Sequence, residues 1–148
     1  MPASEVELNQ VAILYPVFAQ IILTLVLLVA MGRARSAAHR GHEVKYSDIA
    51  LDSSRYPESV RQFGNCYGNQ FELPVIFYVL CLIALATANA DYLMILLAWA
   101  FVITRVIHAY IHTTSNIVLR RGGVFAIGFL IICAMTLILL LRLLFPNL

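Results

Sequence analysis

Two oppositely charged side chains lie in stretches of the chain that are otherwise suited to the interior of a membrane. Glu72 precedes the apolar run LPVIFYVLCLIALATA, and Arg105 lies midway along YLMILLAWAFVITRVIHAYIH. An ionised side chain at such a depth is costly, so it usually faces the interior of a helix bundle, has a partner and marks a functional site. We therefore predict that Glu72 and Arg105 pair beside such a site.

The polar neighbours of these two residues form two stripes with helical spacing, because residues at i, i+3, i+4 and i+7 share one face of a helix. The stripe that contains Glu72 comprises Arg61, Asn65, Gly68, Asn69 and Glu72. The stripe that contains Arg105 comprises Arg105, His108, His112 and Asn116. Two such stripes on adjacent antiparallel helices predict a shared polar cleft. The two histidines have no third ligand at a supportive spacing, so we predict no metal site.

The composition of the chain indicates which elements must position these residues. The chain has 148 residues, of which 61% are hydrophobic and 12% are charged, which lies outside the range of soluble globular domains. A helix of about 20 apolar residues crosses a hydrocarbon core of ~30 Å, and only helices or closed barrels satisfy their backbone there. We predict an all-α integral membrane four-helix bundle, a single domain over residues 1–148, with spans at about 11–31, 57–87, 91–116 and 122–145.

The predicted second and third spans bring the two charges to the same depth. Counted from the short turn between Ala88 and Asp91, Glu72 is about 15 residues back and Arg105 about 14 residues forward, so both lie roughly 20 Å from that end at 1.5 Å per residue. Pro74 removes the amide that would bond the carbonyl of Gln70, which predicts a kink beside the site.

Basic residues predict the orientation of the bundle. They crowd the first connection, which we expect to be a partly ordered loop from Gly32 to Tyr56, and they recur in the third connection. By the positive-inside rule both connections are cytoplasmic and both termini lie on the other side, with Arg142 as an exception that can reach the interface. The net charge of +2 reflects these connections, and nothing indicates a nucleic-acid partner. We expect a bacterial inner membrane.

These stripes contain a recognisable pattern. Its residues in the second, third and fourth spans are Asn69-x-x-Glu72-x-Pro74, Arg105-x-x-His108-x-x-x-His112 and Arg121. The pattern resembles the MAPEG family, the membrane-associated proteins in eicosanoid and glutathione metabolism. The same interval of 36 residues separates Arg33 from Asn69 and Asn69 from Arg105, which is most similar to the microsomal prostaglandin E synthase branch.

The resemblance implies a homotrimer that binds glutathione between neighbouring subunits, in a site open to the cytoplasm. The residues implied to bind glutathione are Arg33, Asn69, Glu72, Arg105, His108 and His112. Arg33 would contact a carboxylate of the peptide, and Asn69 and Glu72 would hydrogen-bond its backbone and amino group. Arg121 is implied to be catalytic, because a guanidinium beside a thiol lowers its pKa and favours the nucleophilic thiolate.

The chain also departs from the family pattern. Asn65 and Gly68 stand where the prostaglandin branch has arginines that hold glutathione, and Gly122 and Phe125 stand where a serine and a tyrosine are expected. Each lost guanidinium removes charge-assisted hydrogen bonds of about 1.5–3 kcal/mol. Arg61, one turn further out, is a candidate replacement.

Three functions are consistent with these observations. The first is a glutathione-dependent membrane transferase or peroxidase that acts on lipophilic electrophiles, which would enter from the bilayer. The second is a non-catalytic lipid-binding or scaffold member of the same family. The third is a small proton-coupled multidrug transporter with Glu72 as the proton carrier, which pairing with Arg105 would disfavour because a paired carboxylate has a depressed pKa.

Overall fold

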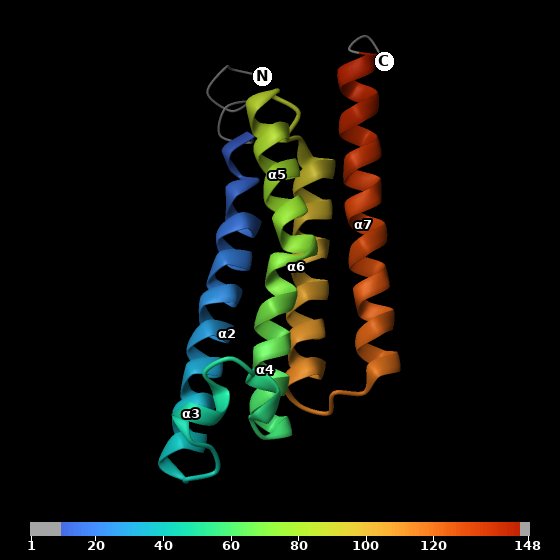
Figure 1. The fold of residues 1–148 in the computed structure, drawn as a ribbon. Helices are drawn as coiled ribbons and strands as arrows, with labels where there is room; N and C mark the ends of the chain where they lie inside the picture. Colours follow the sequence, from blue (N-terminus) through green and yellow to red (C-terminus); the bar gives the residue numbers. More distant parts are fainter. Residues whose placement is uncertain (1–9, 146–148) are drawn as a thin grey trace.

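The computed structural model describes residues 10–145 of the chain as a bundle of long helices (Figure 1). The first, third and fourth long helices are α2 (Leu14–Arg40), α6 (Tyr92–Thr113) and α7 (Val118–Leu144). The second is divided into α4 (Glu58–Gly68), the 3-10 turn η2 (Asn69–Phe71) and α5 (Leu73–Ala86). All four stretches are long and apolar enough to cross a membrane, and the part of the chain that the structure describes contains no strand. The predicted all-α class is confirmed.

The bundle brings both described ends of the chain to one side. Figure 1 shows the start of α2, the α5–α6 turn and the end of α7 at one end, and α3 (Tyr46–Ile49) with the α6–α7 connection at the other. The main core lies where α5, α6 and α7 meet the start of α2, and within it the rings of Phe77 and Phe101 stack with centroids 4.7 Å apart. The side chains that face outward from α2 and α7 are largely apolar and exposed, as expected of surfaces that meet lipid or another subunit.

The first helix is longer than the sequence predicts. α2 continues to Arg40 and ends at Gly41, whose amide bonds the carbonyl of Ala37. The prediction that a loop begins at Gly32 is therefore wrong, and Arg33, Arg35 and Arg40 are helical. Alanine and arginine favour helix, so the helix goes on after its apolar residues end. The rest of the connection holds α3 and a 3-10 turn, η1 (Ser53–Arg55).

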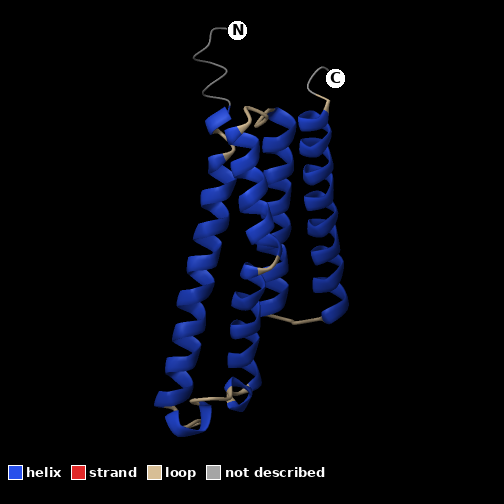
Figure 2. Cartoon of the chain, turned by 45° about the horizontal axis from the view of Figure 1, so that its top comes forward, coloured by secondary structure: helices blue, strands red, loops and turns tan. Residues whose placement is uncertain are grey.

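The second span is broken rather than merely kinked. Glu72 lies between η2 and α5 with φ −100° and ψ −108°, and Pro74 lies in the first turn of α5. Proline is tolerated in the first turn of a helix, where its missing amide would have no intrahelical partner. Figure 2 shows this break as a short loop inside the bundle. The predicted irregularity beside Pro74 is confirmed, and it frees the backbone next to Glu72.

The end of the bundle that holds both described termini contains an ion pair. Asp91 caps α6 by accepting a hydrogen bond from the Met94 amide at 3.0 Å. Arg142 near the end of α7 donates to the Asp91 carboxylate at 2.6 Å and to the carbonyl of Asn89 at 3.3 Å. Partial burial alone would raise the pKa of Asp91, but the hydrogen bonds from Arg142 and Met94 outweigh it and lower that pKa. Arg142 therefore has a local partner on its own side of the bundle.

The contact between α6 and α7 is built around Arg105. Its guanidinium is almost fully buried and lies against the rings of Phe101 and Phe125, with centroid distances of 5.3 and 5.1 Å. Gly128 makes room for it, because a Cβ there would lie 2.6 Å from Nη2 of Arg105 and 2.9 Å from Oγ1 of Thr104. The faces of aromatic rings attract cations, so these rings provide the contacts that a carboxylate was predicted to provide.

The Asp91–Arg142 pair predicts a specific pH dependence. A carboxylate whose pKa is lower in the folded than in the unfolded state stabilises the fold above its unfolded pKa and loses that effect as the pH falls through the folded pKa. The Asp91→Asn variant keeps a cap acceptor but lacks the charge, so it should be less stable at pH 7 by about 0.2–1 kcal/mol, as for other exposed pairs. Thermal unfolding in detergent should show the difference begin to shrink as the pH falls below about 4, near the unfolded pKa of an aspartate, and vanish only below the lower folded pKa of Asp91. Asp48→Asn, at an exposed carboxylate without an ion pair, should not show it.

The Arg105 packing predicts a cost for a single added methyl group. Gly128→Ala should lower the thermal unfolding midpoint, because overfilling a packed interior costs about 1–3 kcal/mol. Gly123→Ala is a matched control on the same helix, since nothing lies within 4 Å of the Cβ that it would add. An equal midpoint for the two variants would contradict the packing described above.

Candidate functional site

A polar cleft of about 700 Å³ opens between α4, α6 and α7, near the end of the bundle that carries the basic connections. Five of the residues predicted to form a site line it, namely Asn69, Glu72, His108, His112 and Arg121. The other lining residues are Gly64, Asn65, Gly68, Val118, Gly122 and Phe125. The predicted polar cleft between the two stripes is therefore present, and the first turn of α7 provides its third wall.

Arg121 is the most firmly held charge in the cleft. Its Nη1 donates to Nε2 of His112 at 2.6 Å and to Oδ1 of Asn116 at 2.9 Å. Because a guanidinium can only donate, His112 accepts at Nε2 and carries its proton on Nδ1. Nδ1 of His108 lies 3.0 Å from the carbonyl oxygen of Arg121 and donates to it. Two histidines and one asparagine thus fix both the side chain and the backbone of Arg121.

The position of Asn116 depends on the end of α6. Asn116 has φ +49°, a conformation that asparagine adopts more readily than most residues, and its amide bonds the carbonyl of Ile111 at 2.8 Å. Sequence analysis included Asn116 in a polar stripe but gave it no role. The signal that could have found it is an asparagine at the end of the predicted third span, five residues before the candidate arginine.

Contacts between α4 and α6 fix the depth of the site. Nε2 of Gln62 donates to the carbonyl oxygens of His112 at 2.6 Å and Thr114 at 3.2 Å. The last turn of α6 is therefore joined to the second turn of α4, and the Arg121–His112 contact lies beside the same turn. Gln62 was not predicted to have a role, and its position outside the polar stripe of α4 gave no signal for one.

The predicted ion pair between Glu72 and Arg105 is wrong. Among residues 10–145 the structure contains one ion pair within 4 Å, Asp91–Arg142. The two side chains point to different places: Glu72 is exposed at the break in the second span, whereas Arg105 is buried against α7 beside Gly128. Arg105 does not line the cleft. Arg105 contacts the site through Phe125, whose ring packs against the Arg105 guanidinium and also lines the cleft.

Arg33 also lies apart from the other predicted residues. It lines a separate groove of about 620 Å³, formed by the outer face of α2 together with Phe63 of α4. Arg61, the candidate replacement for the missing arginines, lines a third cavity and not the cleft. Within one chain the cleft thus contains a single arginine, Arg121.

The positions that depart from the family pattern all face the cleft. Asn65, Gly68, Gly122 and Phe125 belong to its lining. No atom lies within 4 Å of where a Cβ would stand at Gly68 or Gly122. The cleft is therefore wide at these two points. The contacts that hold a ligand there must come from the other lining side chains, such as Arg121.

Comparison with known proteins agrees with the resemblance seen in the sequence. The model of the MAPEG family matches residues 13–141, which includes every residue of the cleft. The match does not distinguish the prostaglandin E synthase branch, so that assignment stays a prediction. Comparisons with curated proteins and with solved structures give no match. With four membrane-capable helices and a family match over nearly its whole length, the chain is an integral membrane protein that belongs to the MAPEG family.

Proposed function

We propose that this protein is a glutathione-dependent transferase or peroxidase that acts on lipophilic electrophiles. The observation that carries the proposal is the guanidinium of Arg121, which His112 and Asn116 hold inside a polar cleft. Family membership supports a role of this kind in a membrane. No carboxylate lies within 4 Å of Arg121 among the described residues, so its charge is available to an anionic ligand.

The chemistry follows from that charge. A thiol beside a guanidinium loses its proton to water more readily, because the cation stabilises the thiolate. The sulfur then donates an electron pair to an electrophilic carbon and forms a carbon–sulfur bond. The electron pair of the bond that breaks at that carbon either leaves with the departing group or, where no group departs, is protonated. Asn69 and Glu72 would hydrogen-bond the amides of the peptide, and His108 would complete the polar wall. The electrophile would enter sideways from the bilayer.

A second subunit would complete this site. Arg33 is too far from the cleft within one chain to line it, and it projects into a groove on the outer face of α2. If α2 of a neighbouring copy packs beside the cleft, Arg33 can contact the glycyl carboxylate of glutathione. Membership of the family is the basis on which we propose a homotrimer with the peptide between subunits. The basic connections support a cleft that opens to the cytoplasm, and a bacterial inner membrane stays a prediction.

A lipid-binding role without catalysis is the second candidate. It is favoured by Gly122 and Phe125, which bring no hydroxyl to the cleft where the family pattern has a serine and a tyrosine. A multidrug transporter is disfavoured by the family match. A Glu72 paired with Arg105 would also disfavour a transporter, but the two do not pair among the described residues.

The proposal predicts the effects of two substitutions. Arg121→Ala should lower kcat/KM for conjugation of glutathione to 1-chloro-2,4-dinitrobenzene by about 100-fold or more, as expected for loss of a preorganised donor at a developing anion. Glu72→Gln should weaken glutathione binding about tenfold, since hydrogen bonds to charged groups contribute about 1.5–3 kcal/mol. Absorbance of the conjugate and isothermal titration calorimetry provide the two measurements.

Arg120→Gln is the matched control, because Arg120 is exposed on the same turn of α7 and does not line the cleft. It should behave as the wild type. Normal turnover in Arg121→Ala would refute the proposed catalytic role. Stoichiometric binding of a fatty acid by the wild type, with no glutathione bound, would favour the lipid-binding candidate instead.

A further inference from the structure

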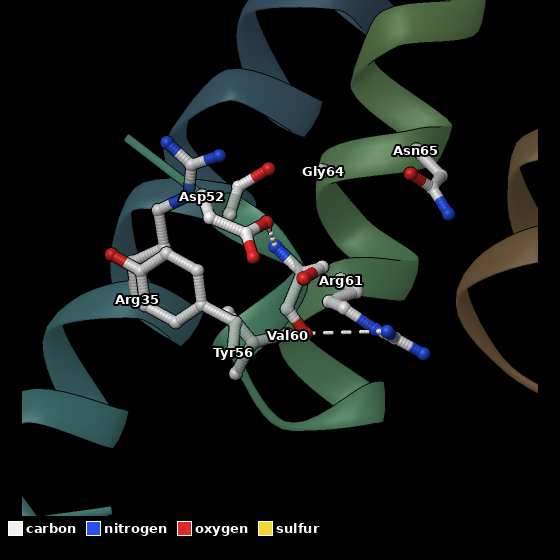
Figure 3. Close-up of a pocket in the computed structure, with 9 residues that line it drawn as sticks. Arg35, Asp52, Tyr56, Val60, Arg61, Gly64 and Asn65 are labelled. Carbon is white, nitrogen blue, oxygen red and sulfur yellow. Dashed lines mark hydrogen bonds between the residues drawn. The ribbon is translucent and has the colours of Figure 1, made fainter. Parts of the chain in front are cut away.

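A second polar cavity of about 500 Å³ lies next to the cleft, where the connection after α2 folds back against α4 (Figure 3). Its charged side chains are Arg35 from α2, Asp52 from the connection and Arg61 from α4. Gly64 and Asn65 line both this cavity and the cleft. The proposed function assigns no role to the three charged residues, although they stand directly beside the site.

Arg35 is held at the wall that the two cavities share. Its guanidinium lies over the ring of Tyr56 at 5.4 Å, and the hydroxyl of Tyr56 is 3.2 Å from Nε2 of His39. A Cβ at Gly64 would lie 3.7 Å from Nη2 of Arg35. The Nε of Arg35 is buried and has no hydrogen-bond partner among the described residues. The stack with Tyr56 thus fixes a cation whose donors are not all used.

Asp52 and Arg61 are fixed separately by the same turn. Oδ1 of Asp52 accepts from the amide of Ser54 at 2.9 Å, and Nη1 of Arg61 donates to the carbonyl of Ser54 at 3.2 Å. Both hydrogen bonds are drawn in Figure 3. The hydrogen bonds with Ser54 lower the pKa of Asp52, so it is a carboxylate at neutral pH. Neither arginine comes within 4 Å of that carboxylate.

Opposite charges that are held apart around one cavity define the ligand that fits it. A dianion such as phosphate would meet the Asp52 carboxylate, and a simple cation would meet two guanidiniums. A group that carries both signs satisfies both, since a carboxylate can take charge-assisted hydrogen bonds from a guanidinium and a primary ammonium can donate to a carboxylate.

We propose that this cavity binds a zwitterionic α-amino-acid head, with the carboxylate at Arg35 and the ammonium at Asp52. The inference rests on the proposed function in one respect: the amino-acid head is that of the γ-glutamyl residue of glutathione. It replaces the expectation from the resemblance that Glu72 holds the amino group, and it leaves Glu72 to the peptide amides deeper in the cleft.

The wall that the two cavities share is consistent with one peptide that reaches both of them. Gly64 and Asn65 form the shared wall, and Gln62 joins the same part of α4 to His112, the partner of Arg121. One helical turn rises about 5.4 Å, whereas an extended tripeptide spans about 10 Å. The proposal therefore places the head in the cavity and the cysteine sulfur of the same peptide at Arg121, on the other side of Gly64 and Asn65.

Charge balance also favours this assignment. Glutathione carries two carboxylates, and within one chain the cleft contains only Arg121, which the chemistry requires at the sulfur. Arg35 can take the γ-glutamyl carboxylate without help from another subunit. The glycyl carboxylate is then left for Arg33 of a neighbouring copy.

The test pairs changes in the protein with changes in the ligand. The full chain in phosphatidylcholine nanodiscs, whose lipid has no primary ammonium, is titrated calorimetrically with glutathione and with N-acetylglutathione. Asp52→Asn keeps the acceptor for Ser54 but removes the charge. Acetylation should weaken binding to the wild type about tenfold, and Asp52→Asn should weaken glutathione binding by a similar factor. Acetylation should then change binding to Asp52→Asn by less than about twofold, because the two changes remove the same interaction.

Arg35→Gln is tested in the same way, with a glutathione analogue in which an amide replaces the α-carboxylate of the γ-glutamyl residue. Asp48→Asn and Lys45→Gln are the matched controls, since both residues are exposed on the same connection and neither lines the cavity. Controls should bind as the wild type. If Arg35→Gln lowers the thermal unfolding midpoint, the two modified ligands on the wild type still decide whether the ammonium and carboxylate are recognised.

Three outcomes are distinguishable. Equal penalties for acetylation in the wild type and Asp52→Asn would overturn the inference while the proposed function stands. Absence of any glutathione binding or turnover in the wild type would refute the proposed function, and a separate titration with O-phosphoethanolamine, the head of an aminophospholipid, then decides. Binding of that probe that is lost in Arg35→Gln and Asp52→Asn would support a zwitterionic site occupied by lipid, and no binding would overturn the inference.

Discussion

The guanidiniums of Arg105 and Arg121 have no carboxylate partner within 4 Å among the described residues, and the rest of the site depends on how each is held instead. Arg105 lies between the rings of Phe101 and Phe125, whereas Arg121 donates to His112 and Asn116. Neutral partners fix the position of a cation without cancelling its charge. The α6–α7 pair therefore presents a fixed positive charge to the cleft, which is the property that a thiolate site requires.

The sequence predicts the elements of this arrangement better than their contacts. Hydropathy located the four spans, and helical spacing correctly grouped Asn69 and Glu72 with one wall of the cleft and His108 and His112 with another. Spacing defines the face on which a residue lies, but not which neighbour that face meets. Arg105 shares the stripe of His108, yet the Arg105 side chain packs against α7, where Gly128 leaves room for it. The ion pair was predicted from the cost of buried charge, from two facing stripes and from matching depth, and none of these fixes the direction in which a side chain points.

The other differences have equally local causes. α2 extends to Arg40 because the residues after its apolar part have good helix propensity. Hydropathy marks only the apolar part of a helix, so it does not detect this extension. Arg33 lines a different groove from the cleft, so the predicted contact between them does not form within one chain. Helical spacing places Arg33 on one face of α2, but it does not say whether that face meets another helix of the same chain.

The break at Glu72 explains why the cleft and the cavity beside it can exist in a membrane protein at all. Regular α4 ends just before Asn69, and the chain passes through η2 and Glu72 before α5 begins. Irregular backbone is tolerated at membrane depth only where protein or water covers it, so the break and the polar cleft require each other. The α4 side of the break is amphipathic and polar, and its first turns reach beyond α6 toward the connection that carries Asp52 (Figure 1). The same short helix thus has one set of side chains in the cleft and another, one turn away, in the cavity under the connection, and any ligand that follows α4 passes from one to the other.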